Sequence, residues 1–267
     1  MKLSVFYDHI LQAKKQTGKP APLLLTEVRT AGIEAVEINM SYLCEHEKVY
    51  GMLKDAGLRV SCVYEFYEME KKDETERARL HIETARKAGA ERILVVPGFV
   101  SGEESVEMAA CLPYPDRTKA YFENNDKILR MEEGLCAMVE RGARENIAVT
   151  VEDFDDVCSP LSGMNGLRWF LDRIPGLGYT FDTGNFIIQK EDERKAFELL
   201  KDRILHVHCK DRGSKPLAVG TGTIPIPGII ERLKQIHYEG YLAIEHFDAE
   251  DQENCIKNSA GFLKNLI

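Results

Sequence analysis

The chain has 267 residues, of which 44% are hydrophobic and 30% are charged, with no biased tract. This composition is typical of a soluble globular protein and excludes a disordered or fibrous chain. The 35 Lys and Arg residues against 44 Asp and Glu residues give a formal net charge of −9. The basic residues are also scattered along the chain, which argues against a nucleic-acid partner.

The cysteines and the N-terminus indicate the compartment. Seven cysteines without a Cys-x-x-Cys pair favour neither a disulfide framework nor a zinc ribbon. Residues 1–5 read as a strand and lack the apolar core of a signal peptide, and no apolar run is long enough to span a bilayer. We expect a cytoplasmic protein with no membrane partner. The sequence leaves open whether it forms a homo-oligomer.

Strand and helix signals alternate along the chain. Alternating or β-branched runs predict strands at residues 3–8, 35–39, 59–67, 92–97, 147–152, 177–182, 204–211 and 241–245. Amphipathic spacing predicts helices at residues 23–31, 43–56, 74–87, 164–172, 193–200 and 227–237, with longer ones carrying residues 128–143 and 256–267. Gly32, Gly57 and Gly89 follow three of these helices, as terminating glycines do.

Residues 98–116 break this alternation. The segment contains Pro113 and Pro115, which interrupt any regular element. We interpret it as an excursion of the loop after the fourth strand and not as a linker between domains. A lid, an interface and a passive loop all remain compatible with this segment.

Eight strand–helix units in one chain predict a fold. The pattern is typical of a single (β/α)₈ TIM barrel, an α/β domain that would cover residues 1–267. A doubly wound open sheet is the alternative. It is disfavoured because residues 6–10, after the first strand, contain no glycine and so lack the usual phosphate-binding fingerprint.

Polar residues end four successive strands of the predicted barrel, namely Glu152, Asp182, His208 and Glu245. Strand alternation lets each point inward, and barrel enzymes place their chemistry at the C-terminal ends of the strands. Three carboxylates and one imidazole suit one divalent cation, Mn²⁺ or Mg²⁺ first, with Co²⁺ and Zn²⁺ as further candidates. Taken alone, each carboxylate fits a loop cap or a salt bridge better, and a lone inward histidine fits a hydrogen-bonded core residue better. Their occurrence together at matching depth favours a metal site.

Three other features of this region have both a functional and a structural interpretation. His206 lies deeper than His208 and reads as a hydrogen-bonded core residue. Lys210 shares the inward parity of His208, so it fits either a substrate contact or an ion pair with Asp211 or another carboxylate. The loop at residues 220–223 fits either a contact with an anion or a hydroxyl group or a simple tight turn. Several residues at the early strand ends could line a pocket without an assigned role: Tyr7, His9, Glu37, Tyr64, Glu65 and Phe66.

A family resemblance rests on the motifs Val151-Glu152-Asp153, Phe181-Asp182-Thr183-Gly184, His206-Val207-His208-Cys209-Lys210-Asp211 and Ala243-Ile244-Glu245. In this order they resemble the xylose isomerase-like TIM-barrel superfamily. The resemblance implies a metal-dependent sugar, sugar-phosphate or sugar-acid isomerase or epimerase with a small-molecule substrate. Glu152, Asp182, His208 and Glu245 would bind the cation. Glu152 and Glu245 would also be the catalytic acid and base, acting through a metal-bound enediolate.

The chain departs from the pattern of the ketose 3-epimerases in this superfamily. Asn185 stands where they carry a substrate-binding His, and Cys158 and Ser214 replace a Glu and an Arg, although Arg212 lies close by. We therefore expect Lys210, Asn185 and Arg212 to contact a different substrate. An inosose-type dehydratase on the same metal site is the alternative. An endonuclease IV-like DNA repair enzyme and a non-catalytic sugar-binding barrel rank below it.

Overall fold

The computed structural model describes residues 1–45 and 47–267. Within them, eight parallel strands close a barrel in which each pairs with the next and the last pairs with the first. The strands are β1 (Lys2–Phe6), β2 (Ala35–Asn39), β3 (Arg59–Phe66), β4 (Arg92–Val96), β5 (Ala148–Glu152), β6 (Gly178–Asp182), β7 (Ile204–Arg212) and β9 (Tyr241–Glu245). A short strand, β8 (Pro216–Leu217), pairs antiparallel with β7. The predicted (β/α)₈ barrel is confirmed.

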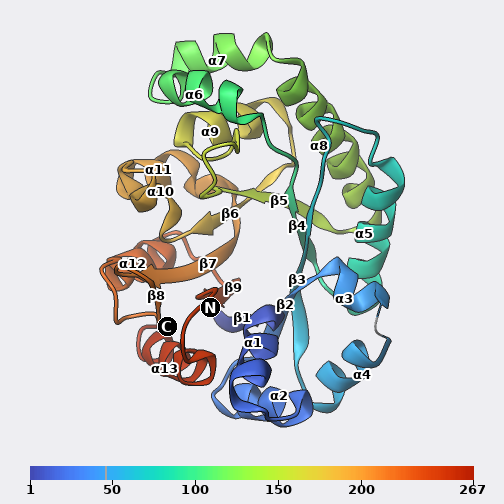
Figure 1. Ribbon diagram of the computed structural model, residues 1–267, viewed down its shortest axis with the longest axis vertical. Helices are drawn as coiled ribbons and strands as arrows, with labels where there is room; N and C mark the ends of the chain where they lie inside the picture. The colour runs from blue at the N-terminus through green and yellow to red at the C-terminus, as the bar shows by residue number, and fades with distance from the viewer. Residues whose placement is uncertain (46) are drawn as a thin grey trace.

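Helices surround the strands on the outside of the barrel (Figure 1). They are α1 (Tyr7–Thr17), α2 (Ala21–Thr30), α3 (Met40–Glu45), α4 (Glu47–Asp55), α5 (Thr75–Ala88), α6 (Gly102–Cys111), α7 (Pro115–Glu123), α8 (Asp126–Glu145), α9 (Met164–Arg173), α10 (Asn185–Ile188), α11 (Glu193–Leu200), the 3₁₀ turn η1 (Lys201–Arg203), α12 (Ile226–Gln235) and α13 (Gln252–Lys264). Among the described residues, no helix is both long and apolar enough to cross a membrane.

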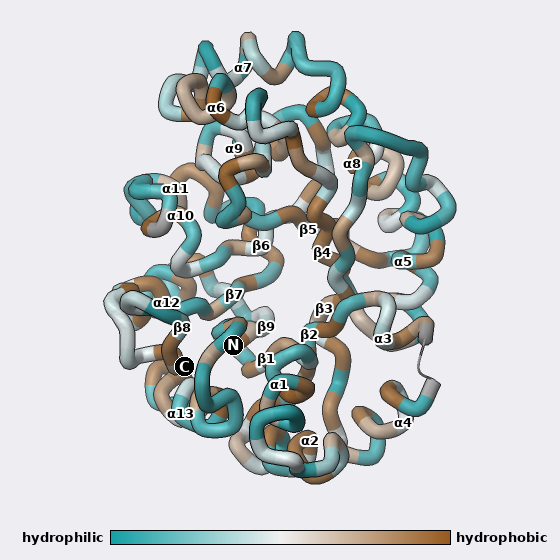
Figure 2. The backbone as a smooth tube through the Cα atoms, in the orientation of Figure 1, coloured by the Kyte–Doolittle hydropathy of each residue, from teal (hydrophilic) through white to brown (hydrophobic). Residues whose placement is uncertain are grey.

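Strand alternation separates two cores. In β5, Val149 and Val151 belong to the large core between the strands and the helices, whereas Thr150 and Glu152 have the opposite parity and face the barrel interior. Figure 2 shows hydrophobic residues gathered along the strands and hydrophilic ones on the outer helices. The interior holds a small apolar cluster of Phe6, Cys62, Tyr64, Leu94 and Ala243. Buried polar pairs such as Thr150–Thr180 lie beside it. The barrel interior therefore combines apolar side chains with polar groups that hydrogen-bond across strands.

The first unit of the barrel differs from the prediction. The strand ends at Phe6, and a helix that the sequence analysis missed, α1, begins at Tyr7. Its buried residues, among them Ile10 and Ala13, lie at helical spacing, and Gly18 ends it in the left-handed conformation with φ 73°. The signal was present but was assigned to the strand and to a turn. The predicted helix at residues 43–56 corresponds to α3 and α4, and its residue 46 lies outside the described residues.

The excursion at residues 98–116 follows β4, as predicted, and holds α6 and the start of α7. Ser101 and Glu104 form a reciprocal capping box at the start of α6. The segment is fastened to α9, because Asn165 Nδ2 donates a hydrogen bond to the carbonyl of Leu112 at 2.8 Å. Phe122 of α7 also packs edge-on against Trp169 at a ring separation of 5.3 Å. It is thus a helical addition to the barrel wall.

Candidate active site

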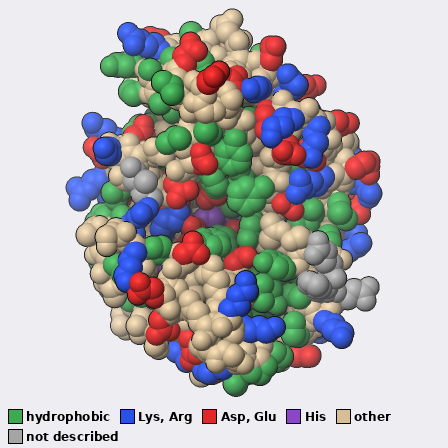
Figure 3. Space-filling view, viewed as in Figure 1, with side chains coloured by type: hydrophobic (Ala, Val, Ile, Leu, Met, Phe, Trp, Pro, Cys, Tyr) green, Lys and Arg blue, Asp and Glu red, His purple; other side chains and the backbone are tan. Residues whose placement is uncertain are grey.

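A cavity of about 450 Å³ lies at the C-terminal ends of the strands, where barrel enzymes hold their active sites. Figure 3 shows it as a hollow in which a histidine lies between hydrophobic and charged side chains. The residues that line it are Phe6, Tyr64, Phe66, Leu94, Val96, Glu152, Phe154, Asp155, Asn185, His208, Lys210, Asp211, Arg212, Pro216, Glu245, His246, Phe247 and Asp248.

His208 lies at the centre of the polar wall. Its Nδ1 is 3.1 Å from Glu152 Oε2 and 3.2 Å from Glu245 Oε2. Strand register brings the cluster together, since Asp182 of β6 pairs with His208 of β7. Glu152, Asp182 and His208 each offer one ligand atom, and these atoms lie within 4.8 Å of one another. The four residues that the sequence singled out therefore meet in space, with Glu245 joined through its contact with His208.

Asp182 has one oxygen fixed by the backbone and one without a hydrogen bond. The N–H groups of Gly184 and Asn185 donate to Asp182 Oδ1 at 2.7 and 3.0 Å. Oδ2 is buried and accepts no hydrogen bond among the described residues; its nearest cation is Lys210 Nζ at 3.3 Å. Burial raises the pKa of Asp182 to about 7, against the opposing effect of Lys210. This buried oxygen therefore has an ion pair with Lys210 but no hydrogen bond from the residues that the structure describes, and it is open to a further cationic ligand.

Lys210 lies among carboxylates. Its Nζ is 2.8 Å from Glu245 Oε1 and 3.6 Å from Asp155 Oδ2, and it donates to Asn185 Oδ1 at 2.8 Å. Of the two interpretations of Lys210 from the sequence, the structure contains the ion pair with carboxylates other than Asp211. The ammonium also lines the cavity, so a substrate contact is not blocked by this arrangement.

The two glutamates have opposite electrostatic environments. Burial raises the pKa of Glu152 above its ordinary value, and His208 offsets this only in part. Burial acts on Glu245 in the same direction, but Lys210 and His208 bring the pKa of this carboxyl below its ordinary value. Two carboxyls whose pKa values are pushed apart are suited to act as acid and base partners.

Asn185 and Arg212 occupy different parts of the site. Asn185 is buried in the wall, where its Nδ2 donates to the carbonyl of Asp153 at 2.6 Å. Arg212 lines the cavity, and among the described residues its guanidinium has no hydrogen bond or ion pair. Asn185 thus positions Lys210, whereas Arg212 is available to a ligand.

An aromatic wall faces the charged residues, and the sequence analysis missed part of it. Phe6 contacts Tyr64 and Phe247 at ring separations of 5.6 and 5.2 Å, and Phe66 contacts Phe154 at 5.9 Å. Phe154 and Phe247 each follow a strand-end glutamate by two residues, a position from which they could have been predicted. Of the early-strand candidates, Tyr64 and Phe66 line the cavity, whereas Tyr7, His9, Glu37 and Glu65 are absent from its lining.

The loop at residues 220–223 agrees with the second of the two interpretations from the sequence, a tight turn. The N–H groups of Gly220, Gly222 and Ile224 donate to the carboxylate of Asp211 at 2.8, 2.9 and 3.1 Å. Asp211 is buried, and its own carboxylate takes the place of the anion that the glycines were expected to bind. The loop is therefore a structural turn that fixes the end of β7.

Glu37 is a buried residue of the site that was given no role. It projects from β2 beneath the cavity, 0% exposed. Its Oε2 lies 2.8 Å from His206 Nε2, and both its oxygens lie 3.2 Å from His208 Nε2. His206 is buried and hydrogen-bonded, as predicted for a core residue. Parity alone did not reveal that the three side chains meet across the barrel.

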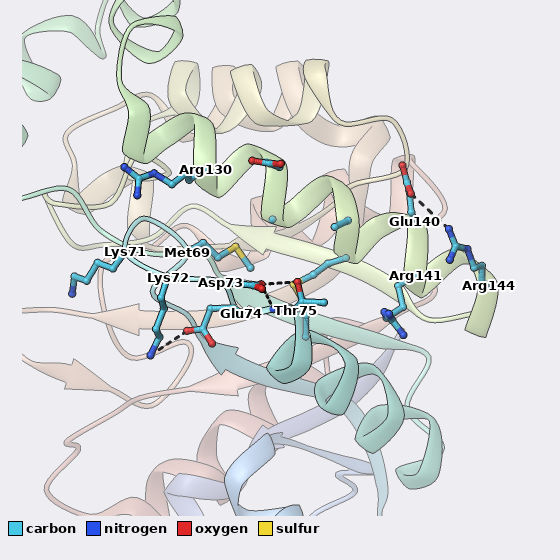
Figure 4. A pocket seen from close by; sticks show the side chains of 15 residues that line it. Met69, Lys71, Lys72, Asp73, Glu74, Thr75, Arg130, Glu140, Arg141 and Arg144 are labelled. Atoms are coloured by element: carbon cyan, nitrogen blue, oxygen red, sulfur yellow. Dashed lines mark hydrogen bonds and ion pairs between the residues drawn. The ribbon is translucent and has the colours of Figure 1, made fainter.

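A larger hollow, of about 610 Å³, lies outside the barrel between α8 and the segment that leads into α5 (Figure 4). Two ion pairs join residues of its lining, Lys72–Glu74 and Arg144–Glu140, at 3.6 and 3.7 Å. It contains none of the strand-end residues. The smaller cavity is therefore the candidate active site.

A closed barrel with polar side chains at the ends of β5, β6, β7 and β9 defines a TIM barrel with an active-site rim. The chain belongs to the xylose isomerase-like TIM barrel family, whose sequence model matches residues 25–266. Among curated proteins, it is similar to the rhizopine catabolism protein MocC of Rhizobium meliloti. The two are 23% identical over 262 residues, which cover 86% of this chain and 76% of that protein.

Solved structures share the fold at low identity. The 3-keto-D-glucoside 4-epimerase YcjR from E. coli has a TM-score of 0.75 and 18% identity, covering 99% of both chains. The probable 3-DHS dehydratase AsbF from Bacillus anthracis has a TM-score of 0.74 and 15% identity, also covering 99% of both chains. A D-psicose 3-epimerase from Clostridium cellulolyticum has a TM-score of 0.75 and 14% identity, covering 100% of this chain and 99% of that one. These likenesses show the fold.

Proposed function

We propose that this protein is a divalent-cation-dependent isomerase or epimerase of a sugar or sugar derivative. The observation that carries the proposal is the convergence of Glu152, Asp182 and His208 within 4.8 Å, with Glu245 in contact with His208. Family membership and the named activities of the structural neighbours support it.

The donor set fits a hard divalent cation. Glu152, Asp182, Glu245 and His208 would hold it, and the buried Oδ2 of Asp182 is the oxygen that lacks a hydrogen bond. Three carboxylates and one imidazole favour Mn²⁺ or Mg²⁺, with Co²⁺ and Zn²⁺ as alternatives. When bound, the cation would polarise a substrate carbonyl and thereby acidify the neighbouring C–H group.

Glu152 and Glu245 are suited to move the proton. One Oε2 from each lies within 3.2 Å of the same nitrogen, His208 Nδ1, so both carboxyls reach the same small volume. One glutamate would take the proton from the carbon beside the carbonyl, and the other would return a proton. Return to the adjacent carbon gives an isomerisation, and return to the opposite face of the same carbon gives an epimerisation.

The cavity walls fit a sugar. Its aromatic side, formed by rings such as Phe6, Phe66 and Phe154, offers a surface for the C–H face of a sugar. Lys210 and Arg212 on the charged side are suited to hydroxyl, carboxylate or phosphate groups. A sugar acid or sugar phosphate therefore fits the site as well as a neutral sugar does.

A dehydratase on the same site is the second candidate. The observation that favours it is the departure of Asn185, Cys158 and Ser214 from the ketose 3-epimerase pattern. The name of AsbF, a probable dehydratase with the same fold, is compatible with it. Proton removal beside a carbonyl, followed by loss of a β-hydroxyl as water, would use the same two glutamates.

Solvent exchange tests the proposed function. The Mn²⁺-loaded protein in D₂O is incubated with a panel of ketoses, ketose phosphates and inososes, and the products are examined by NMR and mass spectrometry. We expect deuterium to be incorporated at the carbon beside the substrate carbonyl. This incorporation should be lost when the metal is chelated and in the Glu152→Gln variant. Glu65→Gln, a buried glutamate outside the cavity lining, is the matched control and should retain it. Loss of water would indicate the dehydratase, and no exchange with any class would contradict both functions.

The state of the cysteines is the basis for proposing a cellular compartment. All seven lie in the described part of the chain and are free thiols. Free thiols in this number are typical of the reducing cytoplasm. We therefore propose a cytoplasmic location.

A further inference from the structure

We propose that Glu37 is a positioning residue that selects the nitrogen through which His208 would bind the divalent cation. This inference rests on the proposed function, because it concerns the same cation site. Glu37 is fully buried on β2 and does not line the cavity, so it cannot contact the substrate. Its effect would act through His208 alone.

The two nitrogens of His208 face opposite environments. Nδ1 faces the upper cluster, 3.1 Å from Glu152 Oε2 and 3.2 Å from Glu245 Oε2. Nε2 faces downward, 3.2 Å from both oxygens of Glu37. The ring is also held in orientation by an edge contact with Phe6 at a ring separation of 5.0 Å. The imidazole therefore spans from the cation site to Glu37.

The hydrogen-bonding requirement of Glu37 assigns the tautomer of His208. A neutral imidazole has one N–H, and an ionised carboxylate only accepts hydrogen bonds. A proton on Nε2 satisfies Glu37 and leaves the Nδ1 lone pair for the cation, whose positive charge would also offset the repulsion between this lone pair and the carboxylates of Glu152 and Glu245. A proton on Nδ1 would instead set two lone-pair-bearing groups, Nε2 and Glu37, against each other. Carboxylates behind metal-binding histidines raise the ligand's basicity in this way.

His206 holds Glu37 in this position. His206 Nε2 lies 2.8 Å from Glu37 Oε2, while its own Nδ1 is buried without a partner among the described residues. Glu37 therefore accepts from two imidazoles at once, and turning away would leave both N–H groups unsatisfied in the core. His206 also lies edge-on to His208 at a ring separation of 5.5 Å, so a variant at this position that keeps a donor to Glu37 tests packing separately from the carboxylate.

Two substitutions separate positioning from packing. Glu37→Gln keeps the volume, but its amide has only one acceptor oxygen, so it cannot satisfy both imidazoles. If the NH₂ group faces His208 Nε2, the proton moves to Nδ1 and blocks the ligand atom. Glu37→Asp keeps an acceptor-only group and should restore part of the affinity. His206→Gln disturbs the same buried region but keeps an amide N–H near the position of Nε2, so the carboxylate behind His208 keeps its donor.

The test uses the full chain stripped of metal and titrated with Zn²⁺, followed by calorimetry and by ¹⁵N NMR of the histidine rings. The wild type should bind Zn²⁺ through Nδ1 of His208 with a proton on Nε2. Glu37→Gln should weaken Zn²⁺ binding roughly 10- to 100-fold, as second-layer substitutions do. Glu37→Asp should lose less affinity for Zn²⁺, and the affinity of His206→Gln should stay within about threefold of that of the wild type.

Zn²⁺ bound to Nε2 of His208, or an affinity of Glu37→Gln within about twofold of the wild type, would overturn the role of Glu37 while leaving the metal site intact. Should Glu37→Gln fail to fold, the ring nitrogens of the wild type and the affinity of Glu37→Asp still decide the outcome. Absence of any Zn²⁺ binding by the folded wild type would overturn the metal site, and the role of Glu37 with it.

Discussion

Lys210 and Glu245 are register partners on β7 and β9, and Lys210 Nζ lies 2.8 Å from Glu245 Oε1. The same ammonium lies 3.3 Å from Asp182 Oδ2. Two buried carboxylates thus share one lysine at the position where the proposed cation would bind. The carboxylates would then be stabilised both by a fixed positive charge of the chain and by an exchangeable one.

Replacing Lys210 should make the thermal stability of the protein depend more strongly on the divalent cation. In Lys210→Met, the buried Asp182 and Glu245 lose their ammonium, and breaking a buried pair costs about 3–5 kcal/mol. We expect a lower melting temperature than that of the wild type in chelator, and a larger rise on adding Mn²⁺. Thermal unfolding with and without Mn²⁺ measures both. Equal melting temperatures in chelator would show that Lys210 does not stabilise the cluster.

The turn after β7 should loosen when Asp211 loses its charge. In Asp211→Asn, one acceptor oxygen becomes an NH₂ group that faces backbone N–H donors, and each unsatisfied group costs about 1–3 kcal/mol. We expect destabilisation and faster amide exchange at Gly220 and Gly222, measured by hydrogen exchange. Asp192→Asn, at the exposed N-cap of α11, is the matched control, since Asn caps as well as Asp. Unchanged exchange at Gly220 would contradict the role given to Asp211.

Stability should fall in mild acid because of His81. This residue is fully buried between Tyr67 OH and the carbonyl of Val63, both at 3.0 Å, and burial lowers the pKa of His81 to about 4. The unfolded value is about 6.5, so the stabilisation is complete above that pH and is lost as the pH falls toward 4. One such histidine loses about 2 kcal/mol by a pH of about 5.

Urea unfolding at a pH of about 7 and of about 5 tests this prediction. His81→Gln cannot titrate, so its stability should change less with pH than that of the wild type. Other buried histidines remain in the variant, such as His246, whose pKa burial also lowers to about 4. The slope should therefore be reduced and not abolished. If the free energy of unfolding changed equally with pH in the wild type and in His81→Gln, His81 would not be the titrating group.

Two helical glycines should respond oppositely to alanine. A Cβ at Gly142 in α8 would lie 2.5 Å from the carbonyl oxygen of Ile147, so Gly142→Ala should destabilise by about 1–3 kcal/mol. A Cβ at Gly261 in α13 meets nothing within 4 Å, so Gly261→Ala should stabilise by up to about 1 kcal/mol. Chemical denaturation measures both. A stabilising Gly142→Ala would contradict the close approach of α8 to Ile147, and a destabilising Gly261→Ala would contradict the open space at that position of α13.

Much of the barrel could be predicted because its signals are local. Alternation fixed the inward parity of Glu152, Asp182 and His208, and successive parallel strands necessarily bring their C-terminal ends to one rim. The helix α1 was missed because it follows β1 directly, with Phe6 at the N-cap position and neither a glycine nor a polar capping residue to mark the boundary. Local patterns therefore predicted the strand–helix units of the barrel but not the boundary between β1 and α1.

The partners of the site residues could not be predicted, because they depend on distances across the barrel. Glu37 reaches His208 across the interior, from a strand separated from it by 171 residues. Lys210 forms an ion pair with Asp155, which lies on a loop whose conformation cannot be predicted from sequence periodicity. The loop glycines suggested an anion, which is present but is Asp211 of the chain itself. Such pairings follow from closure of the barrel and from loop conformation.

The most direct test of the central claim is a calorimetric titration of the metal-stripped protein with Mn²⁺. We expect one Mn²⁺ per chain in the wild type. Asp182→Asn keeps the oxygen that caps Gly184 and Asn185 but removes the charge, so binding should weaken at least about tenfold. Asp172→Asn, on the exposed side of α9, should bind as the wild type does. No heat of binding in the folded wild type, or equal binding by Asp182→Asn, would contradict the claim that these strand ends form a metal site.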